Sequence, residues 1–143
     1  MSEPNPPYSP LLERIMSQRG YRIVGYDDVE ALAHEASVVM LFFAGDHARL
    51  GESNDVAVVL PELDDALQGH VTPLIVARDD ERALQRRFHF SAYPALVFLT
   101  GGAYLGVIEG IRDWVDYMRE VPEILLREPT MPPPFKMPAG CDS

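Results

Sequence analysis

The sequence predicts an α/β protein in which helices cover both faces of a central mixed β-sheet. Short apolar runs alternate along the chain with stretches that have helical periodicity. The apolar run at residues 37–43 is typical of a central strand that is buried on both faces. Near the end of the chain a Gly-Gly pair separates two apolar runs, which predicts a β-hairpin.

The first half of the chain contains three predicted helices. An apolar stripe predicts a short first helix that ends at Gly20, formed by Leu11, Leu12, Ile15 and Met16. Asp27 and Glu30 have the spacing of a capping box, so a second helix is expected over residues 29–33. Apolar residues recur with helical spacing through residues 56–67, where Pro61 is expected to kink a third helix.

The second half predicts three more strands and two helices. Residues 71–77 form the next strand, and residues 79–88 form a charged helix. Strands at 95–100 and 103–108 flank the Gly-Gly turn. The last helix is predicted from one apolar face, made of Ile111, Trp114, Val115, Met118 and Val121.

This order of elements also predicts strand directions. Strands that are joined through helices usually pair in parallel by right-handed crossovers. The hairpin is therefore expected to supply the antiparallel strand of the mixed sheet.

The 143 residues suggest one folded domain between two proline-rich tails. Four of the 13 prolines lie within residues 1–10, and five more lie within 129–138. Such segments are expected to be extended and mobile, so the folded domain is predicted at residues 11–128 and the tails at 1–10 and 129–143.

Composition excludes several classes of protein. The formal net charge of −10 argues against binding to nucleic acid or to an anionic membrane surface. The apolar runs are too short to span a bilayer, and the N-terminus lacks the features of a secretory signal. The single cysteine, Cys141, cannot form an internal disulfide. These features predict a cytoplasmic protein.

The segment SAYPALVFLTGGAYLGVIEG, residues 91–110, resembles the part of thioredoxin in which a cis-proline precedes a β-hairpin. Pro94 matches that proline, so we expect a cis bond between Tyr93 and Pro94; the alternative is a trans proline that begins a strand. In thioredoxins the backbone next to this proline pairs with extended peptides. The resemblance therefore implies a thioredoxin-like fold with a peptide-binding edge.

The thioredoxin cysteine pair is missing. Aligned on Pro61, residues 53–56 (SNDV) stand where thioredoxins have CGPC; aligned on the preceding strand, the pair would fall near residues 47–50. Neither alignment supplies the thiolate that disulfide exchange requires. Leu41 stands in place of the buried acid of thioredoxins, and Ser53 or Asn54 is expected to cap the helix.

Two longer blocks resemble the HyaE/HupG family of hydrogenase expression and formation proteins. They are AGDHARLGESNDVAVVLPEL and YPALVFL…GGAYLGVIEGIRDW, and the similarity covers residues 10–128. The resemblance implies a thioredoxin-like protein without the cysteine pair that acts in maturing membrane-bound [NiFe] hydrogenases. It also implies a chaperone that recognises the twin-arginine signal peptide of the small-subunit precursor.

Acidic residues are the candidates for contacting those arginines. Residues 46–65 contain six acids and one base, which partly reflects the preference of helix N-termini for acids. Carboxylates can pair bidentately with guanidinium groups. The predicted peptide-binding residues are Asp46, Glu52, Asp55, Tyr93 and Pro94, with Phe43 as a further apolar anchor.

A second candidate surface lies at the start of the last helix, at Asp113, Trp114 and Asp116. The spacing of Trp114 favours a core anchor over a partner contact. The four histidines lack metal-ligand spacing, so neither a metal nor a cofactor is expected.

The predicted function is that of a non-catalytic chaperone for the hydrogenase small-subunit precursor, which could also contact other maturation factors. Two alternatives remain at this stage. One is a structural adaptor within a hydrogenase maturation complex, and the other is a residual thiol oxidoreductase that uses Cys141.

Overall fold

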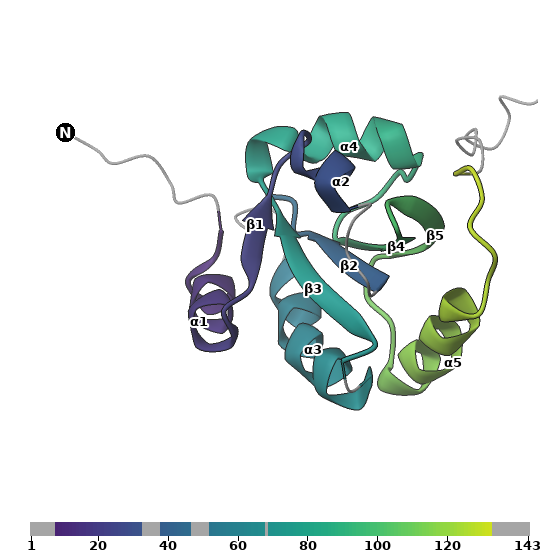
Figure 1. Ribbon diagram of the computed structural model, residues 1–143. Coiled ribbons are helices and arrows are strands. Elements are labelled where there is room, and N and C mark those ends of the chain that lie inside the picture. Colours follow the sequence, from purple (N-terminus) through teal and green to yellow (C-terminus); the bar gives the residue numbers. More distant parts are fainter. Residues whose placement is uncertain (1–7, 33–37, 47–51, 68, 133–143) are drawn as a thin grey trace, which may run out of the picture.

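Five strands form one mixed sheet in the computed structural model, which describes residues 8–32, 38–46, 52–67 and 69–132. The strand order across the sheet is β1-β3-β2-β4-β5 (Figure 1). The strands are β1 (Arg22–Val24), β2 (Val38–Phe43), β3 (Val71–Val76), β4 (Ala95–Thr100) and β5 (Ala103–Glu109).

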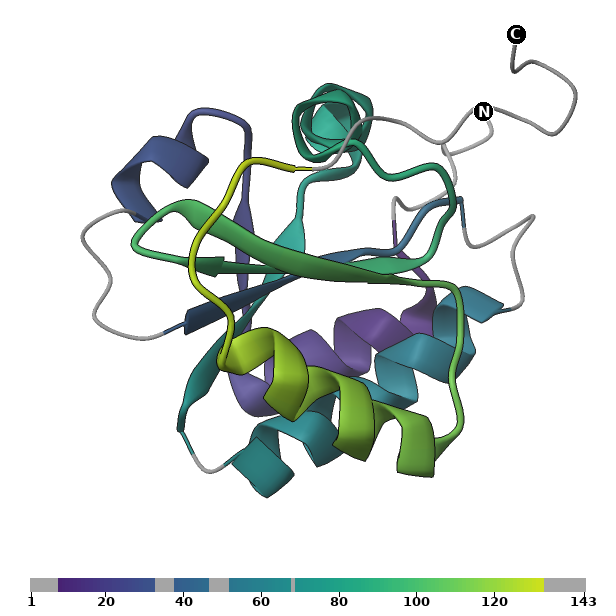
Figure 2. The same cartoon turned by 90° about the vertical axis from the view of Figure 1, so that its right-hand side faces the viewer.

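Helices cover both faces of this sheet, which confirms the predicted fold class. One face carries α1 (Pro10–Arg19), α3 (Glu52–Leu67) and α5 (Trp114–Leu125). The other carries α2 (Asp28–Ala31) and α4 (Glu81–Phe88) (Figure 2). Within the described ranges, every helix is too short or too polar to cross a membrane.

The central strand β2 is buried on both sides, as its apolar sequence predicts. Successive side chains of a strand point to opposite faces. Met40 and Phe42 accordingly pack with α1, α3 and α5, whereas Leu41 and Phe43 pack with α2 and α4. All four are fully buried, so β2 anchors both halves of the core.

The expected direction of β4 is wrong. β4 pairs antiparallel to β2, with Phe43 opposite Ala95, although a helix precedes it. The helix α4 has eight residues, which span only about 12 Å. It packs on one face of the sheet and runs across it toward β4 (Figure 1), so the chain re-enters the sheet at the end where β2 and β3 stop, without a crossover.

The predicted hairpin and cis-proline are both confirmed. β4 and β5 pair antiparallel through a turn in which Gly101 and Gly102 have φ values of 55° and 82°. Residues with side chains rarely adopt positive φ at two successive positions, which explains the glycine pair. The Tyr93–Pro94 bond that precedes β4 is cis.

Residues just outside 11–128 also make ordered contacts. Tyr8 is buried, and its hydroxyl donates a 2.8 Å hydrogen bond to the Val76 carbonyl. Burial and the nearby negative charge of Glu81 raise the pKa of Tyr8 to about 12. At the other end, Thr130 forms a β-bridge with Tyr104. Residues 1–7 and 133–143, including Cys141, lie outside the described part.

The predicted core face of α5 is also wrong in part. The buried side chains of this helix are Tyr117, Val121 and Ile124. Trp114 is 42% exposed because it lies in the first turn, and Val115 is 73% exposed. Tyr117 fills the core position, and its hydroxyl oxygen accepts a hydrogen bond from the Arg112 N–H. Trp114 is therefore not a core anchor.

Candidate functional site

A groove of about 590 Å³ opens at the edge where β2 and β3 end and β4 begins. The shared edge follows from the topology, because parallel β2 and β3 end together and antiparallel β4 starts beside them. The groove is lined by residues that follow β2, by the turn between β3 and α4, by the start of α4, and by the residue before Pro94: Gly45, Asp46, Arg78, Asp79, Glu81, Arg82 and Tyr93.

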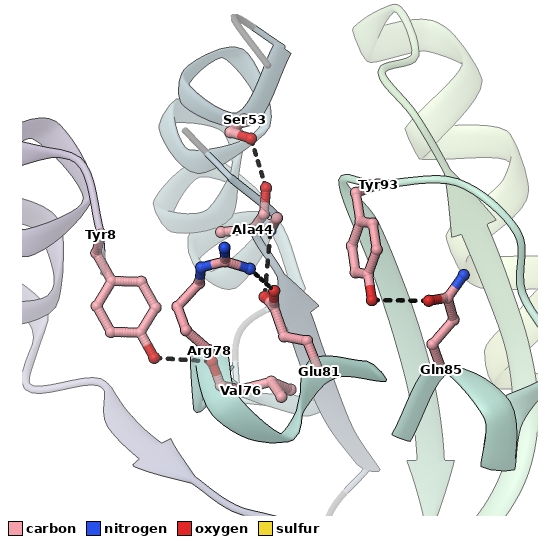
Figure 3. Close-up of polar contacts among 9 residues, drawn as sticks. Tyr8, Ala44, Ser53, Val76, Arg78, Glu81, Gln85 and Tyr93 are labelled. Atoms are coloured by element: carbon pink, nitrogen blue, oxygen red, sulfur yellow. Dashed lines mark hydrogen bonds and ion pairs between the residues drawn. The ribbon is translucent and has the colours of Figure 1, made fainter. Parts of the chain in front are cut away.

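The most buried charged residue of the groove is Glu81, which is 2% exposed. Its carboxylate accepts a 3.2 Å hydrogen bond from the Gly45 N–H and forms an ion pair with Arg78 (Figure 3). Burial raises the pKa of Glu81, while the Gly45 N–H and the Arg78 guanidinium partly oppose that rise. Glu81 thus ties the end of β2 to the start of α4.

Aromatic packing and two hydrogen bonds position Tyr93. Its hydroxyl donates a 2.8 Å hydrogen bond to Gln85 Oε1 (Figure 3). Gln85 Nε2 in turn donates to the Phe90 carbonyl at 3.0 Å. The Phe90 ring meets the rings of Tyr93 and Phe43 edge-on, with centroids 5.7 Å and 4.7 Å away. Phe43 is fully buried in this stack, so its predicted role as a peptide anchor is wrong.

Residues at the end of β5 hold the loop before Pro94. Glu109 Oε1 accepts 2.8 Å hydrogen bonds from the N–H groups of both Ser91 and Ala92. The Gly110 N–H donates to the Pro94 carbonyl at 2.7 Å. The backbone around Tyr93 is therefore held between α4 and the end of β5.

Ser53, which stands at the first thiol position in the alignment on Pro61, makes a structural contact. The Ser53 hydroxyl is buried and donates a hydrogen bond to the Ala44 carbonyl, which joins the end of β2 to α3 (Figure 3). α3 begins at Glu52, so Ser53 lies within its first turn and does not act as the predicted cap. The buried Asn54 Oδ1 has no hydrogen-bond partner, so it caps no N–H group either.

The structure brings together only some of the predicted peptide-binding residues. Asp46 and Tyr93 line the same groove, and Pro94 is buried directly after Tyr93. Asp55 is exposed on α3 and does not line the groove. The side chain of Glu52 and the alternative thiol positions 47–50 lie outside the described residues.

Sequence reasoning missed the contribution of α4 to this groove. Arg78 and Asp79 lie in the short 3-10 turn (Arg78–Asp80) between β3 and α4, and Glu81 and Arg82 begin α4. The sequence predicted only a charged helix at residues 79–88. A signal was available, because charged residues that follow a parallel strand lie at the same edge as the end of its neighbour. The groove consequently carries three carboxylates against two guanidinium groups.

The second candidate surface lies close to the first. Asp113 and Trp114 are exposed at the start of α5, and Asp116 pairs with Arg119 at 3.0 Å. α5 follows β5, whose last residue Glu109 pairs with the first residue of β4. Across the described residues, no three His, Cys, Asp or Glu side chains gather as metal ligands.

Comparisons with known proteins agree with this architecture. The family model "Hydrogenase-1 expression protein HyaE" matches residues 11–117. The hydrogenase expression/formation protein HoxO of Azotobacter vinelandii is 40% identical over 119 residues, which cover 83% of this chain and 80% of that protein. HoxO of Cupriavidus necator is 37% identical over 131 residues, or 90% of this chain and 81% of that protein.

A solved structure is similar as well. The crystal structure of the hydrogenase expression/formation protein HupG from Rhodopseudomonas palustris superposes with a TM-score of 0.53 at 38% sequence identity, covering 73% of this chain and 94% of that one. The thioredoxin-like fold and the family resemblance are thus confirmed. The chain belongs to the HyaE family of hydrogenase expression and formation proteins.

Proposed function

We propose that this protein is a non-catalytic, cytoplasmic chaperone that binds the twin-arginine signal peptide of a [NiFe] hydrogenase small-subunit precursor. The observation that carries the proposal is the groove beside the cis Tyr93–Pro94 bond. In this groove, carboxylates lie next to a cis-proline segment of the kind that binds extended peptides in thioredoxins. Family membership supplies the hydrogenase context.

The chemistry of the groove favours binding over catalysis. The chain has one cysteine, so it cannot form the intramolecular pair that thiol–disulfide exchange uses in this fold. The Ser53 hydroxyl donates its hydrogen bond to the Ala44 carbonyl, and that carbonyl cannot act as a base toward it. The residual oxidoreductase is therefore the weaker alternative.

Two carboxylates of the groove are suited to meet incoming arginines. Asp79 is exposed and Asp46 is half-buried, whereas Glu81 is buried. A carboxylate can accept two parallel hydrogen bonds from one guanidinium, which an ammonium cannot provide. An exposed ion pair contributes only about 0–1 kcal/mol, so charge orients the peptide and apolar contact must supply most of the affinity.

Calorimetry with synthetic peptides tests the proposal. The protein should bind a twin-arginine signal peptide of the small subunit more tightly than the matching twin-lysine peptide. Combined Asp46→Asn and Asp79→Asn should weaken twin-arginine binding by at most about fivefold per carboxylate, because exposed ion pairs are weak. The binding of the twin-lysine peptide should change less.

A matched double variant separates the groove from α3. Asp55→Asn with Glu62→Gln removes the same charge from two exposed residues of α3 that do not line the groove. We expect a smaller loss of twin-arginine affinity than for the groove variant. If the purified protein binds neither peptide but is retained by the mature small subunit or by another maturation factor, the adaptor function replaces the chaperone function.

A further inference from the structure

An exposed apolar surface at the start of α5 is not explained by the core or by the groove. It consists of Ile111, Trp114 and Val115, which are 42%, 42% and 73% exposed, and is called the α5 apolar surface below. The three residues lie within five positions, and one of them is the single tryptophan of the chain. Clustered exposed apolar residues, and tryptophan above all, are typical of binding surfaces.

This surface adjoins the peptide-binding edge. The Gly110 N–H bonds to the Pro94 carbonyl at 2.7 Å, so Ile111 follows a residue that touches the cis-proline segment. β5 ends beside the start of β4, and α5 begins on the side of the molecule where α3 also begins (Figure 2). A ligand that lies along Tyr93 and Pro94 would therefore reach the α5 apolar surface within a few residues.

The charges around the surface restrict what can bind there. Arg112 is turned back onto its own backbone, where its Nη1 donates to the Glu109 carbonyl at 2.6 Å. Its Nε lies 3.4 Å from Glu120 Oε2, close enough for an ion pair although not aligned as a hydrogen bond. Asp113 remains exposed at the rim. The rim thus favours a ligand that is apolar and cationic over one that is acidic.

A twin-arginine signal peptide has that composition, because its arginines precede an apolar stretch. We infer that the α5 apolar surface binds the apolar stretch of the signal peptide while the carboxylates of the groove meet its arginines. This inference rests on the proposed function and assigns the second half of the ligand to a surface. It also supplies the apolar contact that the buried Phe43 cannot make.

The single tryptophan makes the inference directly measurable. A synthetic twin-arginine peptide with its natural apolar stretch should shift the emission of Trp114 to shorter wavelength, because burial removes water from the indole ring. A peptide that keeps the arginines but carries serine and glutamine in place of the apolar stretch should bind at least about tenfold more weakly and leave the emission unchanged.

Three single variants complete the test. Trp114→Ala should weaken binding of the natural peptide by about tenfold or more, and Val115→Ser by several-fold. Val115 is so exposed that its substitution is not expected to affect folding. The control is Leu126→Ser, which removes an 86% exposed apolar side chain just beyond the opposite end of α5 and should leave binding unchanged.

The outcomes distinguish the role of the α5 apolar surface from the proposed signal-peptide binding itself. Binding of the natural peptide with no change in Trp114 emission, together with full affinity in Val115→Ser, would overturn the assignment of the α5 apolar surface and leave the proposed function standing. A failure of the wild-type protein to bind any of the peptides would overturn both.

Discussion

Replacing Glu109 tests how the peptide-binding edge is held. Glu109 Oε1 accepts hydrogen bonds from the N–H groups of Ser91 and Ala92, at 2.8 Å each, just before the cis Tyr93–Pro94 bond. A hydrogen bond to a charged acceptor contributes about 1.5–3 kcal/mol, but both N–H groups here are exposed and water can replace the carboxylate. We therefore expect Glu109→Ala to cost about 1–2 kcal/mol in total.

Urea denaturation followed by circular dichroism measures that loss of unfolding free energy. In thermal denaturation, Tm should fall by roughly 4 °C for each kcal/mol. Amide hydrogen exchange locates it, because the Ser91 and Ala92 amides should lose protection while the Gly110 amide keeps it. Glu109→Gln is the matched control, since its Oε1 can still accept both bonds. Unchanged stability and unchanged exchange in Glu109→Ala would refute the idea that this carboxylate holds the edge.

Three further predictions concern two residues of the groove and the absence of thiol chemistry. Tyr93→Phe should lower the free energy of unfolding by about 1 kcal/mol, because Gln85 Oε1 loses its hydroxyl donor; a neutral effect in urea denaturation would contradict the role of that bond. Burial raises the pKa of Glu81, so its contribution to stability is present at low pH and is lost as pH rises through the folded pKa. Wild type should accordingly gain stability relative to Glu81→Gln as pH falls from 7 toward 4.5, the ordinary Glu pKa, and denaturation curves that diverge in the opposite direction would refute this sign. The protein should not accelerate insulin reduction by dithiothreitol, and acceleration that disappears in Cys141→Ser would establish the oxidoreductase alternative.

The parts of the fold that the sequence predicted are those with strong local signals. The apolar run of β2 required burial on both faces, and the Gly101-Gly102 pair required a tight turn. The resemblance of the segment around Pro94 to thioredoxin predicted the cis bond, which the structure contains. In each case neighbouring residues in the sequence determine the geometry.

The incorrect predictions concern features that contacts between distant parts of the chain determine. The direction of β4 depends on where α4 lies relative to the sheet edge, and the composition of α4 does not reveal that. The exposure of Trp114 depends on which side of α5 faces the sheet, and the buried side is formed by Tyr117, Val121 and Ile124. Glu81 was missed because a buried carboxylate needs partners from another segment, here Gly45 at the end of β2.

Amide chemical-shift mapping of the full chain with the twin-arginine signal peptide tests the central claim most directly. We expect the strongest changes at Gly45, Asp46 and Tyr93, which line the groove, and at residues 110–115, which begin with the Gly110 N–H bonded to the Pro94 carbonyl. Strong changes confined to β1, the edge strand on the other side of the sheet from β5, would contradict the assignment of the groove.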